Sequence, residues 1–353
     1  MNAAAAFEVK GWCPGALRPM ESGDGLLVRI KPWGGAFTVA QAAGVAGLAA
    51  RLGNGQIDLT RRANLQIRGL GEETLPELHR ALDRLGLLDA DAATEAARNV
   101  MVGPVAGPEV RALTVALTQA IVAERRLAAL PAKFGWLVDG GGPLSIIDER
   151  ADVALSVSAD GVALRAKGVW LGVAAADRAV KAAIALALGE RPLLAAMKAV
   201  PVGGVRKLGL QSGLFGIGVP FGRLDAPQLA ALSKTAGAAE IRLSPWRALY
   251  IDALVPDAAA LGLIIDEADP LLRIEACPGA PACRSSSVDT RGTARRLAAR
   301  GFDGTIHVSG CAKGCARSTP ADLTLVGDGG RYGVVRHGAT RDPIERTLAP
   351  EEI

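Results

Sequence analysis

The feature that most constrains the fold of this chain is an internal repeat. Residues 57–70 line up with residues 241–254, and the apolar positions and one hydroxyl residue match at a constant offset. Upstream, residues 26–34 match residues 214–222 at a nearly equal offset. Any two units of the same type share some pattern, but agreement at this many positions favours duplication. The sequence therefore predicts two copies of one α/β unit.

Each copy has the pattern strand, helix, strand, strand, helix. In the first copy, one helix is expected from Thr38, an N-cap residue, to Gly53, and a second helix ends near Gly86. The second helix has leucines on one face at 75, 78, 82 and 85. In the second copy, Asp225 is expected to open one helix and Asp257 the other. Two such units can pair their sheets about a pseudo-twofold axis.

The region between the copies has a different pattern. We expect a long helix over Pro108–Leu130, a strand over Phe134–Val138, a hairpin that turns at Asp160 and Gly161, and an alanine-rich helix from about Ala174. After the second copy, a helix near Ser286–Arg300 and strands at Thr305–Val308 and Leu323–Val326 are expected. The glycines of segment 327–333 lie between two strand patterns, so a hairpin turn is favoured over a dinucleotide loop.

Four of the five cysteines form two close pairs, Cys277 with Cys283 and Cys311 with Cys315. Four thiolates suit either zinc or an iron–sulfur cluster. Zinc sites space each pair by two to four residues, whereas the first pair here encloses five. Glycine and proline crowd both pairs and let backbone amides turn toward cluster sulfides. The pattern favours a [4Fe–4S] cluster over zinc or disulfides.

The remaining composition excludes several functions. No apolar run is long enough to cross a bilayer, and the first ten residues do not read as a secretory signal, so we expect a cytoplasmic protein with no membrane contact. The net charge is only +4, no basic block stands out, and aromatic residues make up 4% of the chain. Nucleic-acid binding is therefore not expected. A mild positive balance is compatible with a polyanionic small substrate.

The cysteine pairs and the repeat together resemble the sulfite and nitrite reductase superfamily. Three further stretches are similar to its motifs: Leu59 to Gln66, Arg98-Asn99-Val100, and Leu130 to Phe134. The resemblance implies an α+β fold, with duplicated ferredoxin-like half-domains paired about a pseudo-twofold and α/β cluster-binding domains beside them. The implied domains are 12–88 and 208–268 for the half-domains, 95–200 for the central domain and 271–340 for the cluster-binding domain.

The resemblance also implies the site residues. Arg62, Arg98 and Lys133 would be catalytic and bind substrate, with Asn64 and Gln66 beside them. Guanidinium forks bind carboxylates and oxyanions bidentately, and a lysine adds a mobile, proton-bearing charge. Arginines on strands are more often solvated or paired, and we interpret Arg61, Arg68 and Arg242 in that way.

One departure from the superfamily pattern narrows the range of possible substrates. Sulfite reductases carry a second lysine where this chain has Gly135. The loss of that charge argues against a site for a small sulfur or nitrogen oxyanion. Glycine is expected to leave room for a large substrate.

The N-terminal stretch 11–29 resembles the opening of the precorrin-3B synthases, a branch of this superfamily. That resemblance implies a monooxygenase of aerobic cobalamin biosynthesis, which hydroxylates precorrin-3A at C20 with O2 and closes the ring A acetate onto C1 as a γ-lactone. A second iron centre, non-haem iron or siroheme, is implied beside the [4Fe–4S] cluster, with Cys315 as the candidate bridge. No 2-His-1-carboxylate spacing is visible. No nicotinamide fold is apparent, so an external electron-donor protein is expected.

Two other functions compete with this one. A siroheme-dependent sulfite or nitrite reductase would carry stoichiometric haem, and Gly135 argues against it. A non-catalytic tetrapyrrole-binding or electron-carrier protein would bind without forming product. Cys13 is interpreted as a small buried residue outside the site, and the histidines at 79, 307 and 337 lie too far apart in the pattern to form one site.

Overall fold

The computed structural model describes residues 12–235 and 237–353. By internal contacts the chain divides into two compact units. The larger contains residues 12–20 and 27–265, and the smaller contains residues 21–26 and 266–353. The first ten residues, from which no secretory signal was expected, lie outside the described residues.

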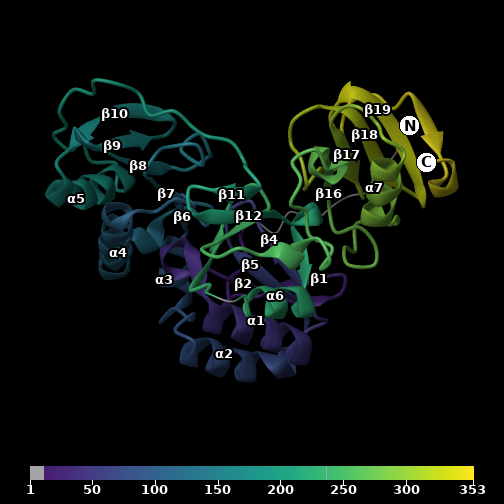
Figure 1. Ribbon diagram of the computed structural model, residues 1–353, viewed down its shortest axis with the longest axis horizontal. Coiled ribbons are helices and arrows are strands. Elements are labelled where there is room, and N and C mark those ends of the chain that lie inside the picture. The colour runs from purple at the N-terminus through teal and green to yellow at the C-terminus, as the bar shows by residue number, and fades with distance from the viewer. Residues whose placement is uncertain (1–11, 236) are drawn as a thin grey trace. The chain divides into compact units, whose positions relative to one another are not determined.

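The first sheet, most of whose residues belong to the larger unit, has the order β1 (Met20–Ser22), β2 (Gly25–Ile30), β5 (Leu65–Leu70), β4 (Gln56–Leu59), β13 (Arg223–Asp225). Helices α1 (Val39–Leu52) and α2 (Leu75–Arg84) lie side by side below its strands in Figure 1. Thr38 caps α1 with a reciprocal capping box to Gln41, and Gly53 follows the last turn. The helix predicted from Thr38 to Gly53 is confirmed.

The second sheet repeats the first. Its order is β11 (Gly209–Gln211), β12 (Leu214–Gly218), β15 (Ala248–Ile251), β14 (Glu240–Leu243), β3 (Ala36–Thr38). Helix α6 (Ala226–Leu232) starts from Asp225, which forms the same kind of capping box with Gln228. The strand, helix, strand, strand order of both copies confirms the predicted duplication.

The two sheets exchange one strand each. Strand β3 of the first copy pairs antiparallel with β14 of the second, and β13 of the second copy pairs antiparallel with β4 of the first. Each exchanged strand has only three residues and leads directly into a capped helix. The two copies were expected to pair their sheets, and they do so by this reciprocal exchange of strands.

The final helix of the second copy is not formed. Asp257, expected to open a helix, lies in a single 3-10 turn (Pro256–Ala258). Gly262 adopts a positive φ of 75°, and Ile264 then returns to the sheet by bridging Gly218. Too few residues separate Asp257 from this bridge for a helix to extend, so this prediction was wrong.

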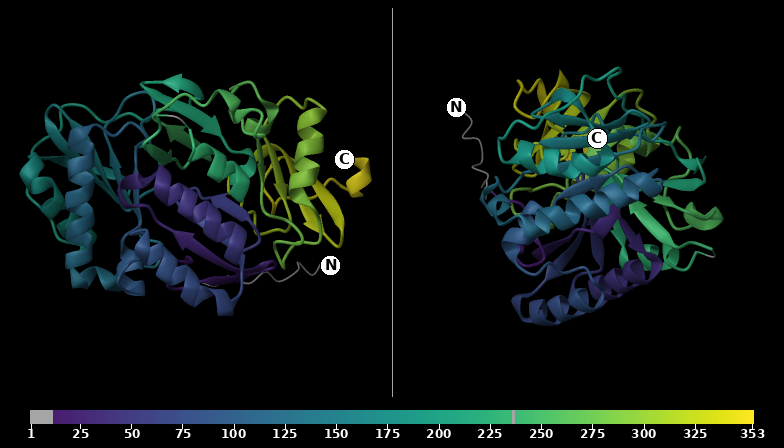
Figure 2. Two further views of the ribbon diagram at one scale, coloured as in Figure 1. Left: turned by 60° about the horizontal axis from the view of Figure 1, so that its bottom comes forward. Right: turned by 90° about the vertical axis from the view of Figure 1, so that its left-hand side faces the viewer.

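A third sheet lies between the two copies in sequence, in the order β10 (Val169–Ala174), β9 (Gly161–Ala166), β8 (Val153–Ser158), β7 (Trp136–Asp139), β6 (Val100–Val102). Helices α4 (Pro108–Ala123) and α5 (Ala176–Ala187) contact each other and this sheet, and both are visible at the left of Figure 2. Their apolar faces form a core with Leu117, Trp136 and Leu155. The predicted hairpin at Gly161 and the alanine-rich helix are confirmed.

Two boundaries in this region differ from expectation. The helix predicted to Leu130 ends at Ala123, because Glu124 adopts extended backbone and a 3-10 turn (Arg125–Ala129) follows. The strand predicted from Phe134 begins at Trp136. Residues 131–134 instead form a turn, which is closed by the N–H of Phe134 donating to the carbonyl of Pro131. Short helix α3 (Ala92–Ala97) precedes the sheet.

The smaller unit contains one five-stranded sheet and helix α7 (Thr290–Ala299). The strand order is β16 (Ile274–Ala276), β17 (Ile306–Ser309), β18 (Ala321–Asp328), β19 (Arg331–Gly338), β20 (Arg346–Leu348). The first three strands are parallel, and β18 and β19 form the predicted hairpin at the Gly329–Gly330 turn. Asp289 caps α7, so the helix expected from Ser286 begins later. None of the described helices has the length and apolarity to cross a membrane.

Candidate functional site

The two cysteine pairs come from neighbouring strands of the smaller unit. Cys277 directly follows β16, and Cys311 follows β17 after one glycine. Because β16 and β17 are parallel neighbours, their carboxyl ends lie at the same edge of the sheet. The strand order therefore brings together two loops that are far apart in the sequence.

One backbone amide of these loops already points at a cysteine sulfur. The N–H of Gly310 donates to Sγ of Cys277 at 3.2 Å, and Oγ1 of Thr290 donates to the carbonyl of Cys277 at 2.6 Å. A Cβ on Gly310 would lie 2.2 Å from Oγ of Ser286. The loop after β17 is therefore restricted to glycine at this point, which keeps its amide next to the thiol.

The four thiols are close enough to influence one another electrostatically. Burial raises the pKa of Cys311, and the nearby Cys283 and Cys277 raise it further. Desolvation of the thiol, followed by the charges of the other three cysteines, raises the pKa of Cys315 to about 11. All five cysteines are free thiols, so the disulfide alternative is not observed.

Four thiols on two glycine-containing loops, with an amide directed at one sulfur, are a donor set that suits a [4Fe–4S] cluster. Among residues 12–235 and 237–353, no group of three or more His, Cys, Asp or Glu is arranged to hold a single metal ion, so the cluster assignment rests on the chemistry of the donors and on the strand order that brings their loops together. The thiols must lose their protons to bind iron, so metal binding and proton release are coupled, and the raised pKa values of Cys311 and Cys315 strengthen that coupling.

In the larger unit the structure brings Arg62 and Lys133 together. Arg62 lies on the turn between β4 and β5, and its Nη2 donates to the carbonyl of Lys133 at 2.8 Å. The Lys133 side chain itself is exposed. A Cβ on Gly135 would lie 2.9 Å from Nη1 of Arg62. The space expected at Gly135 for a large substrate is thus occupied by Arg62, which corrects that expectation.

Asn64 has a supporting position beneath this pair. It is buried, and its Nδ2 donates to Oδ1 of Asn99 at 3.2 Å. Asn99 in turn donates through Nδ2 to the carbonyl of Phe134 at 3.4 Å. Gln66 lies half-buried on β5, opposite Asp58 in the strand register. The asparagine contacts tie the Arg62 turn to the Lys133 turn.

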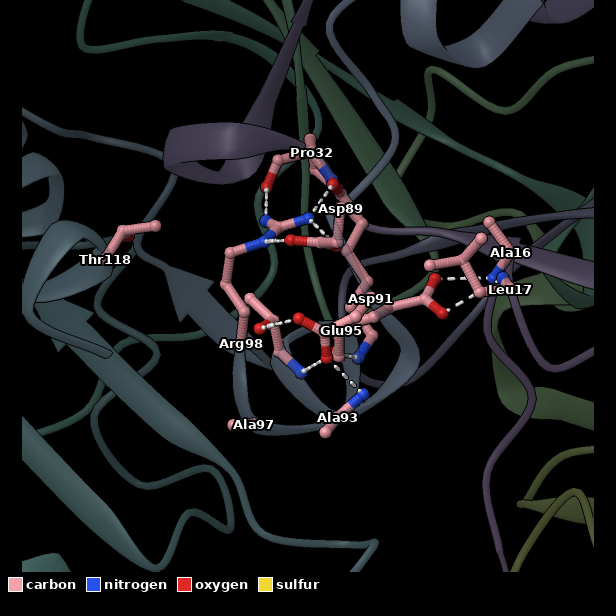
Figure 3. A network of polar contacts seen from close by, with 12 residues as sticks. Ala16, Leu17, Pro32, Asp89, Asp91, Ala93, Glu95, Ala97, Arg98 and Thr118 are labelled. Atoms are coloured by element: carbon pink, nitrogen blue, oxygen red, sulfur yellow. Dashed lines mark hydrogen bonds and ion pairs between the residues drawn. The ribbon is translucent and has the colours of Figure 1, made fainter. Parts of the chain in front are cut away.

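Arg98 is buried inside the same unit, and Figure 3 shows its side chain directed toward Asp89. Its Nε and Nη2 donate to the two carboxylate oxygens of Asp89 at 2.6 and 2.7 Å. Nη2 also donates to the carbonyl of Lys31, and the guanidinium lies 3.9 Å from the ring centroid of Trp33. A guanidinium satisfied on these sides is suited to holding segments in place, and its geometry favours a positioning role over direct contact with a substrate.

A cavity of about 320 Å³ in the larger unit contains residues that sequence reasoning did not select. Lys31 and Glu95 line it, together with Cys13 and Arg18. Burial lowers the pKa of Lys31 to about 8, and its Nζ donates to the carbonyl of Glu95. The sequence signal was a lysine within the apolar end of a strand pattern.

Glu95 holds the N-terminal segment against this cavity. Its carboxylate accepts the N–H groups of Ala16 and Leu17 (Figure 3). A Cβ on Gly15 would lie 2.2 Å from that carboxylate. Cys13 is half-buried. Burial lowers the pKa of the neighbouring Arg29, while the nearby Cys13 raises it. Cys13 therefore lies beside a buried cation.

Two of the three arginines interpreted as structural, and the three histidines, can be placed in the fold. Arg68 pairs with Asp58, and Arg242 pairs with Glu240 and donates to the carbonyl of Pro104. The three histidines lie on separate elements: His79 on α2, buried His307 on β17, and exposed His337 on β19. They do not form one site.

Comparison with known proteins finds relatives that agree with the resemblance noted in the sequence. Residues 18–85 match the family model for the nitrite/sulfite reductase ferredoxin-like half domain. A precorrin-3B synthase from Sinorhizobium sp is 32% identical, over 94% of this chain and 83% of its own length. A ferredoxin–nitrite reductase from Synechococcus elongatus is 26% identical, over 88% of this chain and 77% of its own.

The fold has a solved counterpart. The NirA protein of Mycobacterium tuberculosis matches with a TM-score of 0.66 and 20% sequence identity. The match covers 93% of this chain and 78% of that one. The predicted α+β fold with ferredoxin-like half-domains is thus confirmed.

Proposed function

Because the chain belongs to the precorrin-3B synthase family, we propose that it hydroxylates precorrin-3A at C20 with O2 and closes the ring A acetate onto C1 as a γ-lactone. Its relatives are oxidoreductases, and the chain is an enzyme of that class. The observation that carries the proposal is the similarity to a precorrin-3B synthase along 94% of the chain.

The reaction balances as a monooxygenation. One oxygen atom of O2 ends in the C20 hydroxyl group, and the other leaves as water. Two electrons and two protons are consumed in this reduction. The C1–C20 double bond opens in this step: C20 gains the hydroxyl group, C1 gains the acetate oxygen that closes the lactone ring, and the acetate carboxyl gives up its proton. The electrons would come from an external donor protein, and the cytoplasmic location remains a prediction.

Cys277, Cys283, Cys311 and Cys315 would hold a [4Fe–4S] cluster in the smaller unit. Such a cluster supplies single electrons when bound. The Gly310 amide would remain a hydrogen-bond donor to the Cys277 sulfur and favour its negative charge. Cys315 is our candidate bridge to a second iron centre, either non-haem iron or siroheme.

The larger unit would bind the carboxylates of the tetrapyrrole. Arg62 keeps one nitrogen on the Lys133 carbonyl and has further N–H donors for a substrate carboxylate. Lys31 and Arg18 supply positive charge in the 320 Å³ cavity. Orientation of C20 is the main contribution that such contacts make to a hydroxylation.

Arg98 would act on the substrate indirectly. Its ion pair with Asp89 holds the guanidinium in place, and its hydrogen bond to the carbonyl of Lys31 fixes the residue that follows β2. Asn64, held by Asn99, would support the Arg62 turn in the same way. Lys133, with its exposed side chain, and Gln66 complete the proposed substrate-binding set.

The decisive test uses anaerobically purified protein, precorrin-3A, a chemical electron donor and ¹⁸O2. We expect one labelled oxygen in the product and no turnover without electrons. Iron and sulfide should be present at about four each per chain, as a [4Fe–4S] cluster requires. Unlabelled product, or zinc without sulfide, would contradict the proposal.

A siroheme-dependent reductase is the second candidate, favoured by the 26% identity to a nitrite reductase. It predicts haem equal in amount to the protein and turnover of sulfite or nitrite. The same preparation distinguishes the two functions, because haem content and oxyanion turnover are measured on it directly. A third outcome, tetrapyrrole binding with cluster reduction but no product, would support the carrier function.

A series of cysteine variants tests the assignment of the ligands. Alanine at any of the four paired positions should lower bound iron strongly, because each removes one thiolate. Cys13→Ala is the matched control and should keep its iron and sulfide, because Cys13 lies in the larger unit and the paired cysteines in the smaller. Iron loss in the Cys13→Ala protein would contradict this ligand set.

A further inference from the structure

We infer that Gly135 is a positioning residue for Arg62, and that through Arg62 it sets the affinity for the carboxylates of the substrate. This inference rests on the proposed function, because it takes the ligand to be a polycarboxylate tetrapyrrole. It concerns a residue with no side chain, whose contribution is the space that it leaves open.

The backbone at Gly135 is fixed on both sides. Its N–H donates to Oδ2 of Asp152 at 2.8 Å, and its carbonyl accepts the N–H of Asp152 at 2.8 Å. The next residue, Trp136, donates its N–H to the carbonyl of Asn99 at 2.9 Å. These hydrogen bonds hold the backbone at Gly135, so the backbone cannot shift to make room for an added side chain.

Glycine is required here for space and not for backbone conformation. Gly135 is absent from the described glycines with positive φ, so alanine can adopt its backbone angles. A Cβ at this position would lie 2.9 Å from Nη1 of Arg62 and 3.4 Å from Nδ2 of Asn99. The closest atom belongs to the guanidinium, so the guanidinium is the group that must move.

Arg62 is anchored but electrostatically uncompensated. Its Nη2 donates to the Lys133 carbonyl at 2.8 Å, and no carboxylate among residues 12–235 and 237–353 pairs with it. Its charge also lowers the pKa of Arg29, a smaller effect than the burial of that residue, so two cations lie within electrostatic reach. A held guanidinium with unused donors beside a second cation suits a carboxylate group.

Displacing this guanidinium should cost little stability. The group lies at the far end of a flexible side chain, so it can swing away and remain solvated. It would then lose its anchor on the Lys133 carbonyl. A Gly135→Ala protein is therefore expected to fold normally and to bind the substrate poorly, which a purely structural glycine would not produce.

The test is a double-mutant cycle with Gly135→Ala, Arg62→Ala and the double variant. The probe is uroporphyrin I, a stable tetrapyrrole with eight carboxylates, and its Kd is measured by fluorescence. We expect Gly135→Ala to weaken binding about tenfold, the usual effect of losing a hydrogen bond to a charged group. In the Arg62→Ala background the same change should have almost no effect. The uncharged octamethyl ester should not distinguish the variants.

Gly47→Ala is the matched control, because a Cβ on Gly47 meets no atom within 4 Å. It should leave the Kd unchanged. Equal weakening by Gly135→Ala with and without Arg62, or an unfolded Gly135→Ala protein, would overturn the inference while leaving the proposed function intact. If the unmodified protein did not bind uroporphyrin I, the tetrapyrrole function itself would fail.

Discussion

At the scale of single residues, Arg98 connects its own segment to two others of the larger unit, the one at Asp89 and the one at Lys31 and Trp33. Its guanidinium holds Asp89, the carbonyl of Lys31 and the ring of Trp33. Asp89→Ala would leave this cation buried without an anion, and we expect a loss of about 3–5 kcal/mol in the free energy of unfolding. Urea denaturation measures the change.

The control for this prediction is an exposed ion pair. Lys198 and Asp160 pair with side chains that are largely in solvent. Lys198→Ala should therefore change the free energy of unfolding by less than about 1 kcal/mol. Similar losses in the two variants would show that the burial of Arg98 is not what makes its pair important.

Lys31 makes stability depend on pH. Its pKa is about 8 in the folded protein and 10.5 in the unfolded chain. Between these values only the unfolded chain binds the proton, so this residue makes the free energy of unfolding rise as pH increases from 8 to 10.5. The rise is at most about 3.5 kcal/mol, since one pKa unit corresponds to about 1.4 kcal/mol.

Lys31→Met isolates this contribution from other groups that titrate in the same range. Urea denaturation at pH 7.5, 9 and 10 should show a stability difference between the two proteins that shifts in favour of the natural lysine as pH rises. A difference that stays constant across these pH values would contradict a lowered pKa at Lys31.

The site residues show what sequence can and cannot predict. Cysteine spacing predicted two pairs of thiols on two loops. The structure brings these loops to one edge of the sheet, because each follows one of two neighbouring parallel strands. Arg98 was expected to contact substrate, because a guanidinium serves a ligand carboxylate and a buried aspartate by the same chemistry. Only the structure shows that the carboxylate of Asp89 already binds the guanidinium of Arg98. The filling of the Gly135 space by Arg62 is likewise a long-range contact without a local signal.

At the scale of secondary-structure elements, two equivalent capping boxes start α1 and α6. Thr38 and Asp225 each accept the N–H of the residue three positions on. Thr38→Ala and Asp225→Ala should each lower the free energy of unfolding by about 1 kcal/mol. Thermal unfolding measures both, and Thr38→Ser should recover most of the loss in α1. No loss in either variant would contradict the capping role.

Helix starts were predictable because their signals are local. Thr38 and Asp225 are caps that a short window reveals, whereas the missing helix at Asp257 is decided by the bridge between Ile264 and Gly218. The exchanged strands were not foreseen as strands. Each has only three residues, and its pairing depends on a partner in the other copy.

At the scale of the larger unit, neither copy forms a complete sheet alone. Without β13, strand β4 keeps β5 on one side but lacks a neighbour on the other, and Asp58 loses the two contacts of 2.8 and 3.0 Å from Arg223. A fragment of residues 12–90 should therefore lack a cooperative unfolding transition. Circular dichroism during heating measures this. A monomeric fragment with a sharp transition would contradict the importance of the exchange.

The strand exchange also determines how long the first copy remains incomplete while the chain is being synthesised. Asp58 and Arg223 are 165 residues apart in the chain. At 5–20 residues per second, a ribosome needs roughly ten to thirty seconds to add the partner of β4 after β4 itself. Throughout that interval the nascent first copy presents an open β-edge, the kind of surface that chaperones cover. Slow translation of the central region would lengthen the exposure, so the rate of elongation between the two copies becomes a determinant of yield.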